Sequence, residues 1–237
     1  MGLLHSVRVM AEMARVTVPT VVEAAIGRLD RQTMDGRTHQ FAQRAMEILA
    51  VDLRITGGAE VLPDATYVYM SNHQSHMDIP VLYASLPSPT IRMLAKTELF
   101  RIPLWGQALR AAEFIEVDRA DPVRARDSVR RAAELIRDGV SVYLAPEGTR
   151  SRDGKEGALK KGGFHLALDT GTPIVPVAIR GAIDILPRGG RAMRTGRTVH
   201  VHIGAPIAVA GRTVDALRAE VEAFLHRHVE GLTTKSV

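Results

Sequence analysis

The residues of this chain best suited to chemistry are His73 and Asp78, which stand five positions apart directly after the short apolar run 67–70. A neutral imidazole has an ordinary pKa near ~6.5, so it can accept a proton at neutral pH. A carboxylate bonded to the other ring nitrogen fixes the imidazole tautomer and stabilises the imidazolium. The pair therefore predicts a general base, with the nucleophile supplied by the substrate.

The surrounding sequence predicts how the two side chains meet. The apolar run favours a buried strand, and residues 75–78 are suited to the start of a helix. In a strand–turn–helix unit, His73 lies in the turn and Asp78 lies in the first part of the helix. We therefore expect the imidazole and the carboxylate to be in contact.

The composition favours a folded protein with an anionic partner. The chain has 237 residues, with 46% apolar residues, 24% charged residues and no cysteine, which excludes disulfides and thiolate metal sites. Its net charge of +5 and pI near 9.9 favour phosphate, nucleic acid or an anionic lipid surface as the partner. No apolar run reaches the length of a membrane span, and Arg8, Glu12 and Arg15 interrupt the apolar core that a signal peptide needs.

Residues 1–50 are predicted to form three helices. Apolar residues recur at helical spacing from Leu3, Pro19 suits the first turn of a second helix, and Gly36 separates a third. Two interpretations of this segment stay open. Its helices pack on the core, or they form an amphipathic anchor on a membrane surface, which needs apolar area together with cations.

From residue 51 onwards, strands and helices alternate, which predicts an α/β fold with a mostly parallel central sheet and helices on both faces. We therefore divide the chain into an N-terminal helical segment, 1–50, and an α/β domain, 51–237. The predicted strands are 51–56, 66–71, 91–95, 113–117, 140–145, 174–180 and 197–203. The predicted helices are 76–85, 103–111, 122–138, 161–169 and 213–229.

A second polar stretch, 144–151, follows the predicted strand 140–145. Ligands of open α/β sheets bind beyond the carboxyl ends of the strands. Gly148 allows close approach of the backbone to an anion, Thr149 offers a hydroxyl, and Arg150 offers a planar fork of donors for phosphate. Glu147 is unsuited to phosphate and is expected to hold Arg150 or a substrate hydroxyl. The stretch predicts a phosphate site near His73.

Five segments in order resemble the motifs of the glycerolipid acyltransferases. Residues 72–78 are similar to the family's asparagine-histidine, four residues, aspartate motif, and 146–151 are similar to its second signature. The segments 95–106, 160–165 and 174–179 also match. The resemblance covers about residues 50–205, and the most similar group is the 1-acylglycerol-3-phosphate acyltransferases. The chain departs from the family at Ala112-Glu113, because the family often has a glycine just before its arginine-ended motif and this chain has none there.

The resemblance implies transfer of a fatty acyl group from an acyl thioester to the free hydroxyl of lysophosphatidate, which gives phosphatidate in phospholipid biosynthesis. His73 and Asp78 would be catalytic, and seven other residues would bind substrate: Asn72, Lys96, Arg119, Glu147, Gly148, Thr149 and Arg150. It implies no cofactor, with acyl-CoA or acyl-ACP (acyl carrier protein) as co-substrate. The expected partners are a lysophospholipid and an anionic membrane surface, with peripheral attachment at the cytoplasmic face.

Other interpretations are kept as alternatives. The acceptor can be another lysolipid, and His73, His76 and Asp78 are also the residue types of a zinc hydrolase site. His76 itself is expected to make a local hydrogen bond. The basic segments 122–138 and 188–197 fit a basic membrane-binding module or a nucleic-acid surface. Aromatic residues make up 4% of the chain, so the stacking platforms of nucleic-acid binders are scarce, and nucleic acid is not the expected partner.

Overall fold

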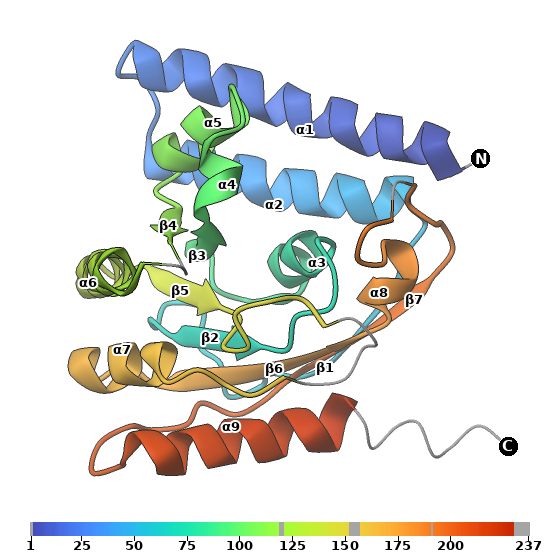
Figure 1. Ribbon diagram of the computed structural model, residues 1–237. Helices are drawn as coiled ribbons and strands as arrows, with labels where there is room; N and C mark the ends of the chain where they lie inside the picture. Colours follow the sequence, from blue (N-terminus) through green and yellow to red (C-terminus); the bar gives the residue numbers. More distant parts are fainter. Residues whose placement is uncertain (1, 119–120, 152–156, 191, 230–237) are drawn as a thin grey trace, which may run out of the picture.

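The computed structural model describes residues 2–118, 121–151, 157–190 and 192–229 (Figure 1). Its centre is a seven-stranded sheet with the strand order β1-β7-β6-β2-β5-β3-β4. The strands are β1 (Asp52–Gly57), β2 (Val68–Ser71), β3 (Ile91–Lys96), β4 (Ile115–Val117), β5 (Ser141–Leu144), β6 (Ile174–Arg180) and β7 (Thr198–Ile203). Neighbouring strands are parallel except β6 and β7, which pair antiparallel.

Helices cover both faces of this sheet, as the sequence predicts. The longer helices are α1 (Gly2–Ala25), α2 (Arg31–Ile48), α3 (Asp78–Ser85), α5 (Trp105–Ala111), α6 (Pro122–Arg137), α7 (Gly162–Thr170) and α9 (Val214–Val229). Two short helices are α4 (Thr97–Phe100) and α8 (Ala182–Ile185). In Figure 1, α1 and α2 lie together above the sheet and α9 lies below it.

The direction of the connections explains which helix covers which face. The connection from β2 to β3 crosses the sheet one way, whereas those from β4 to β5 and from β5 to β6 cross it the other way. Right-handed crossovers then place α3 on one face and α6 and α7 on the opposite face. Side chains of β2 alternate accordingly, because Tyr69 joins the core below α2 and α3 whereas Val68 and Met70 join the core with α6, α7 and α9.

The predicted strands and helices of the α/β domain are confirmed, with no boundary shifted by more than two residues. The start of α6 is as expected, because the Asp121 side chain accepts the N–H groups of Val123 and Arg124. The short helices α4 and α8 were not predicted. Each is one turn long, so neither gives a periodic pattern in the sequence.

The prediction for residues 1–50 is wrong in its number of helices. Pro19 lies inside α1 and Gly36 lies inside α2, so two helices form a hairpin where three were expected. A proline in a helix removes one backbone hydrogen bond but does not end the helix when packing supports both sides. Here Thr20 is fully buried against α2, and its hydroxyl bonds the carbonyl of Val16, one turn earlier.

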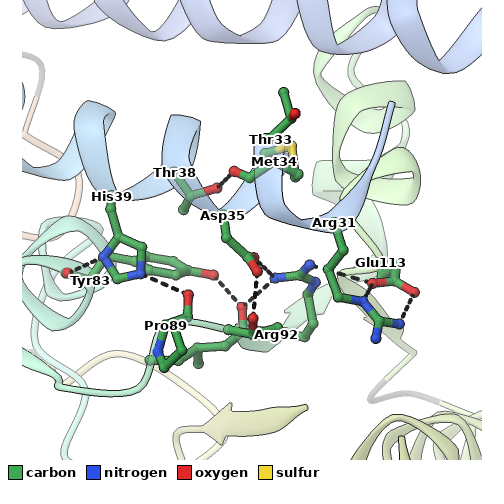
Figure 2. A network of polar contacts seen from close by, with 12 residues as sticks. Arg31, Thr33, Met34, Asp35, Thr38, His39, Tyr83, Pro89, Arg92 and Glu113 are labelled. Carbon is green, nitrogen blue, oxygen red and sulfur yellow. Dashed lines mark hydrogen bonds and ion pairs between the residues drawn. The ribbon is translucent and has the colours of Figure 1, made fainter. Parts of the chain in front are cut away.

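A buried polar network joins this hairpin to the sheet (Figure 2). Arg92 on β3 is 2% exposed and forms ion pairs with Asp35 of α2 and, at 3.4 Å, with Glu113 before β4. Arg31 at the start of α2 bonds the same Glu113 carboxylate through two nitrogens, each at 2.8 Å. Buried ion pairs are expensive to desolvate, so they fix geometry more effectively than they add stability. The network therefore sets the position of α2 over β3.

Helix α1 exposes large apolar side chains and buries mainly hydroxyl side chains. In α1 the buried side chains include Ser6, Thr17 and Thr20, whereas large apolar side chains face solvent. The exposed ones are Leu3, Leu4, Val7, Met10, Val18 and Val22. None of the described helices combines the length and the apolar character needed to cross a membrane.

Candidate active site

His73 and Asp78 are in contact, as the sequence predicts. His73 follows the end of β2, Asp78 is the first residue of α3, and His73 Nδ1 lies 2.7 Å from Asp78 Oδ2. The Asp78 side chain is fully buried, whereas 17% of the His73 side chain is exposed. The turn between His73 and Asp78 thus places the buried carboxylate of Asp78 against the partly exposed imidazole of His73.

The turn also supplies hydrogen-bond donors to the Asp78 carboxylate. Its Oδ2 atom accepts the backbone N–H groups of Gln74 and Ser75, at 2.8 and 2.9 Å. The N-terminal end of α3 adds a favourable dipole for a negative charge. Because Oδ2 already accepts two backbone N–H groups, its bond with His73 fits a proton on Nδ1 and leaves Nε2 as the acceptor. This is the tautomer that a general base needs.

The loop after β5 supports the loop that carries His73. The Glu147 carboxylate accepts the backbone N–H of His73 at 2.9 Å and that of Gly157 at 3.0 Å. In the other direction, the backbone N–H of Ser151 bonds the carbonyl of His73 at 2.7 Å. Because β2 and β5 are adjacent strands, the two loops meet at one edge of the sheet. His73 is thereby held on both sides of its peptide unit.

Glu147 was expected to hold Arg150 or a substrate hydroxyl, and the first of these expectations is wrong. Glu147 is 6% exposed, its carboxylate bonds backbone N–H groups and not Arg150, and it does not line the cavity that opens beside His73. Burial raises the pKa of Glu147, opposed by its bonds from Gly157 and His73. One of its partners, His73, lies 74 positions away in the sequence, and the short spacing between Glu147 and Arg150 gave no indication of that contact. Its contacts are with backbone, which gives it a positioning role.

A cavity of about 230 Å³ opens beside His73. Of the predicted substrate-binding residues, Lys96, Thr149 and Arg150 line it. They come from the ends of β3 and β5, which flank each other in the sheet. Arg188, which sequence reasoning did not assign to the site, also lines it. The cavity therefore carries several cationic groups next to the imidazole.

Other predicted residues do not line this cavity. Both polar atoms of the Asn72 amide bond the backbone of Ile179 on β6, at 2.8 Å each, so Asn72 joins two strands. Gly148 is buried with φ +72°, and a Cβ atom there would lie 2.9 Å from the side chain of Lys160. Its glycine is needed by the loop itself. Arg119 lies outside the described residues.

His76 lines the cavity as well, but its expected local hydrogen bond is absent from the described part of the chain. Desolvation and then the charge of Arg150 lower the pKa of His76 to about 4, with His73 and Lys96 acting in the same direction. Its partly exposed ring is therefore neutral at pH 7. Within the described ranges no three His, Cys, Asp or Glu side chains gather closely enough to hold a metal ion.

Arg150 and Arg188 give the cavity its positive charge. Burial lowers the pKa of Arg150, the charge of Arg188 lowers it further, and the charge of Asp78 raises it. An arginine stays protonated throughout the physiological range. The sequence contained a signal for Arg188, because it follows β6, which pairs with β2, through the short helix α8. That connection places it at the same edge of the sheet as His73.

An apolar cavity of about 80 Å³ adjoins the charged one. It lies beneath the helical hairpin, between α1, α2, α3 and α5. The two cavities share the side chains of Ile79, Trp105, Leu109 and Phe114. The site therefore combines a base, a cationic wall and an apolar extension, as an amphiphilic substrate with an anionic head group requires.

Known proteins are similar to this chain in sequence. The sequence model of the Acyltransferase family matches residues 53–180. A chloroplast 1-acyl-sn-glycerol-3-phosphate acyltransferase of Brassica napus is 40% identical over 152 residues, which are 63% of this chain and 44% of that protein. Another, of Arabidopsis thaliana, is 39% identical over 152 residues, 63% of this chain and 42% of that protein. The chain thus spans less than half the length of these plant relatives.

A solved structure is similar over the whole chain. The 1-acyl-sn-glycerophosphate (LPA) acyltransferase PlsC from Thermotoga maritima superposes with a TM-score of 0.84 at 28% sequence identity. The match covers 100% of this chain and 98% of that one, so it includes the helical hairpin as well as the sheet.

Proposed function

This chain belongs to the acyltransferase family, and from that premise we propose that it transfers a fatty acyl group from an acyl thioester to lysophosphatidate. The product is phosphatidate, as in phospholipid biosynthesis. The observation that carries the proposal is the His73–Asp78 hydrogen bond beside a cationic cavity that adjoins an apolar one. The names of the related proteins support the same reaction.

His73 acts as the general base. Its Nε2 atom takes the proton of the free glycerol hydroxyl while that oxygen attacks the thioester carbonyl carbon. The tetrahedral intermediate then collapses, the C–S bond breaks, and the imidazolium returns the proton to the leaving thiolate. Asp78 keeps the ring in the required tautomer and stabilises the imidazolium. No acyl group is attached to the protein in this scheme.

The phosphate of the acceptor binds on the cationic wall. Arg150 offers a planar pair of donors, Thr149 a hydroxyl and Lys96 an ammonium group, and all three line the cavity with His73. An acceptor held by its phosphate presents a hydroxyl to Nε2. Positioning of this kind converts an encounter in solution into a reaction within one complex, which is a large part of catalysis.

The apolar cavity beneath the hairpin receives a fatty acyl chain. It is lined by Val16, Phe41, Tyr83 and other apolar side chains, and it joins the reaction cavity at Ile79 and Trp105. The thioester is supplied by acyl-CoA or acyl-ACP as co-substrate, and no step requires a cofactor.

The protein works on the surface of a membrane, attached at the cytoplasmic face without spanning the bilayer. The exposed apolar side chains of α1 supply the area for insertion between lipids, and the net charge of +5 favours anionic lipid. A lysolipid embedded in that surface then has a short path to the cavity below α1.

The proposal is tested by an acyl-transfer assay with lysophosphatidate, zwitterionic lysophosphatidylcholine and neutral monoacylglycerol offered side by side. We expect transfer to lysophosphatidate, and a loss of about 10²–10⁴ in kcat for His73→Ala with an unchanged circular dichroism spectrum. A His73→Ala protein that keeps most of its activity would remove the general base from the scheme. Preference for a neutral or zwitterionic acceptor would overturn the assigned head group.

A further inference from the structure

Arg188 lies beside Arg150 in the reaction cavity. Its Nη1 atom donates a hydrogen bond to the backbone carbonyl of Arg150 at 3.1 Å, and both side chains line the cavity with His73. Arg188 comes from the segment after α8, so it reaches the site from a different part of the chain than the loop that carries Arg150. Two independent connections thus deliver two guanidinium groups to one place.

No carboxylate in the described part of the chain forms an ion pair with either of these two cations, Arg150 and Arg188. Lys96, by contrast, lies 3.8 Å from the carboxylate of Glu98. The ionisable groups on the cavity wall are His73, His76, Lys96, Arg150 and Arg188. His73 must be neutral to act as a base, and His76 is neutral at pH 7. The arginine pair is therefore the main unneutralised charge facing the bound head group.

We propose that Arg188 determines head-group specificity by completing, with Arg150, a two-guanidinium site for the dianion of a phosphate monoester. A monoester carries close to two negative charges at neutral pH, and a diester carries one. Two adjacent guanidinium groups repel each other, and a dianion relieves that repulsion more fully than a monoanion does. The site consequently favours lysophosphatidate over lysolipids whose phosphate is esterified a second time.

This inference rests on the proposed function and concerns the charge of the acceptor that the same site selects. A sharp probe of that charge is lysophosphatidylmethanol, which differs from lysophosphatidate by one methyl group and one ionisable oxygen. We expect the wild-type protein to have the higher kcat/KM with lysophosphatidate. For Arg188→Gln, we expect the ratio of the two kcat/KM values to fall about tenfold, mainly through KM for lysophosphatidate.

Matched variants separate local charge from other effects. Arg188→Lys keeps the charge but lacks the planar fork, so it should retain most of the ratio. Arg194→Gln removes the same charge from the same segment, but Arg194 is exposed and does not line this cavity, so the ratio should not change. Circular dichroism and thermal unfolding confirm that each variant is folded.

The pH dependence of the ratio gives a second, independent readout. Both acceptors use the same base, so the ionisation of His73 cancels when their kcat/KM values are divided. The ratio should rise through the second ionisation of the monoester, near pH ~6, in the wild-type protein and less steeply in Arg188→Gln. A loss of activity through misfolding would lower both kcat/KM values and leave the slope intact.

The outcomes are distinguishable. A wild-type protein without transfer to lysophosphatidate would overturn the proposed function, and this inference with it. An active wild-type protein whose ratio and pH slope are the same in Arg188→Gln would overturn the role of Arg188 and leave the proposed function standing.

Discussion

His73 and Asp78 illustrate how much chemistry a short sequence can specify. Their contact was predictable because both residues lie in one turn, where a spacing of five positions leaves few geometries. The roles of Asn72 and Glu147 were not predictable in the same way. Asn72 bonds the backbone of a residue 107 positions away, and Glu147 bonds the backbone of one 74 positions away. Both side chains were expected to bind substrate, because the sequence does not show such distant contacts.

Asp78→Asn tests the orienting role of the carboxylate. An amide nitrogen at the position of Oδ2 can donate to Nδ1 and shift the His73 proton to Nε2, but it cannot accept the two backbone N–H groups that Oδ2 accepts. The wrong tautomer cannot accept the hydroxyl proton, so we expect kcat to fall by about 10²–10⁴, with a smaller change in KM. Steady-state kinetics with lysophosphatidate provide the measurement.

The control for this variant is Asp64→Asn, which changes an exposed aspartate outside the site in the same chemical way. It should leave kcat unchanged. If Asp78→Asn kept the wild-type kcat while remaining folded, the carboxylate would be a structural residue of the turn and no part of the proton transfer.

At the scale of elements, the sequence patterns were reliable where packing follows local periodicity. The strands β2, β5 and β6 are buried over their whole length, except the last residue of β6, and were recognised from their apolar runs. The hairpin of α1 and α2 was not recognised, because Pro19 and Gly36 are helix-breaking signals in isolation. The contacts that override them are made between segments, such as those of Thr20 with Met34 and Arg37 and that of Asp35 with Arg92, and they leave no periodic pattern in the sequence.

Glu113 is an element-scale feature with an unusual backbone. It has φ +59°, a left-handed backbone conformation in which glycine is favoured. In this conformation its carboxylate bonds both Arg31 and Arg92. The strained backbone at Glu113 is therefore unfavourable, whereas the ion pairs of its carboxylate connect the hairpin to the sheet.

Two substitutions at Glu113 separate these effects. Glu113→Ala keeps the strained backbone but loses both ion pairs, so we expect it to destabilise the fold by about 1–3 kcal/mol. Glu113→Gly loses the same ion pairs but relieves the strain, so it should be about 1 kcal/mol more stable than the alanine variant. Urea unfolding of the three proteins measures both differences. Equal stability of the alanine and glycine variants would show that the backbone is not strained.

The packing of α9 is expected to depend on pH. The rings of His202 and His228 stack at 4.0 Å between centroids, and burial lowers the pKa of both, with further lowering of His228 by the charge of His202. A histidine whose pKa is lower in the folded state binds more protons when unfolded. Its contribution to stability is therefore complete above the unfolded pKa of ~6.5 and is lost as the pH falls below it.

His228→Phe keeps a ring in the stack but removes one of the two titrating groups. We expect the variant to lose less stability than the wild-type protein between pH 7 and pH 5, because only His202 then takes up a proton. Thermal unfolding midpoints over that range give the comparison. Parallel curves for the two proteins would show that the stacked pair does not contribute to acid sensitivity.

At the scale of the whole molecule, the site depends on parts of the chain that sequence reasoning had to treat separately. The reaction cavity combines residues from the β2–α3 turn, the ends of β3 and β5, helix α5 and the segment after α8. The fold class and the edge of the sheet at which the site forms were predictable from the order of strands and motifs. Arg188 was overlooked although it closely follows a predicted strand, and the apolar cavity was not predictable because it depends on how distant segments pack together.

The arrangement of α1 over this cavity leads to the prediction with the widest consequence. Its exposed face is apolar, with Leu4 64% and Val7 57% exposed, whereas its buried face includes three hydroxyl side chains. A helix that only packed on the core would show the opposite distribution. We therefore expect the protein to float with vesicles that contain anionic lipid, and more weakly with zwitterionic vesicles.

Leu4→Ser combined with Val7→Ser should weaken vesicle binding about tenfold or more, because two apolar side chains no longer leave water. Leu62→Ser is the matched control, since Leu62 is also exposed, at 62%, but lies outside the hairpin. Activity with a short-chain, water-soluble lysophosphatidate should persist in the double variant, whereas activity with vesicle-embedded lysophosphatidate should fall with binding. Equal flotation of the double variant and the wild-type protein would instead assign the exposed face of α1 to a contact other than lipid.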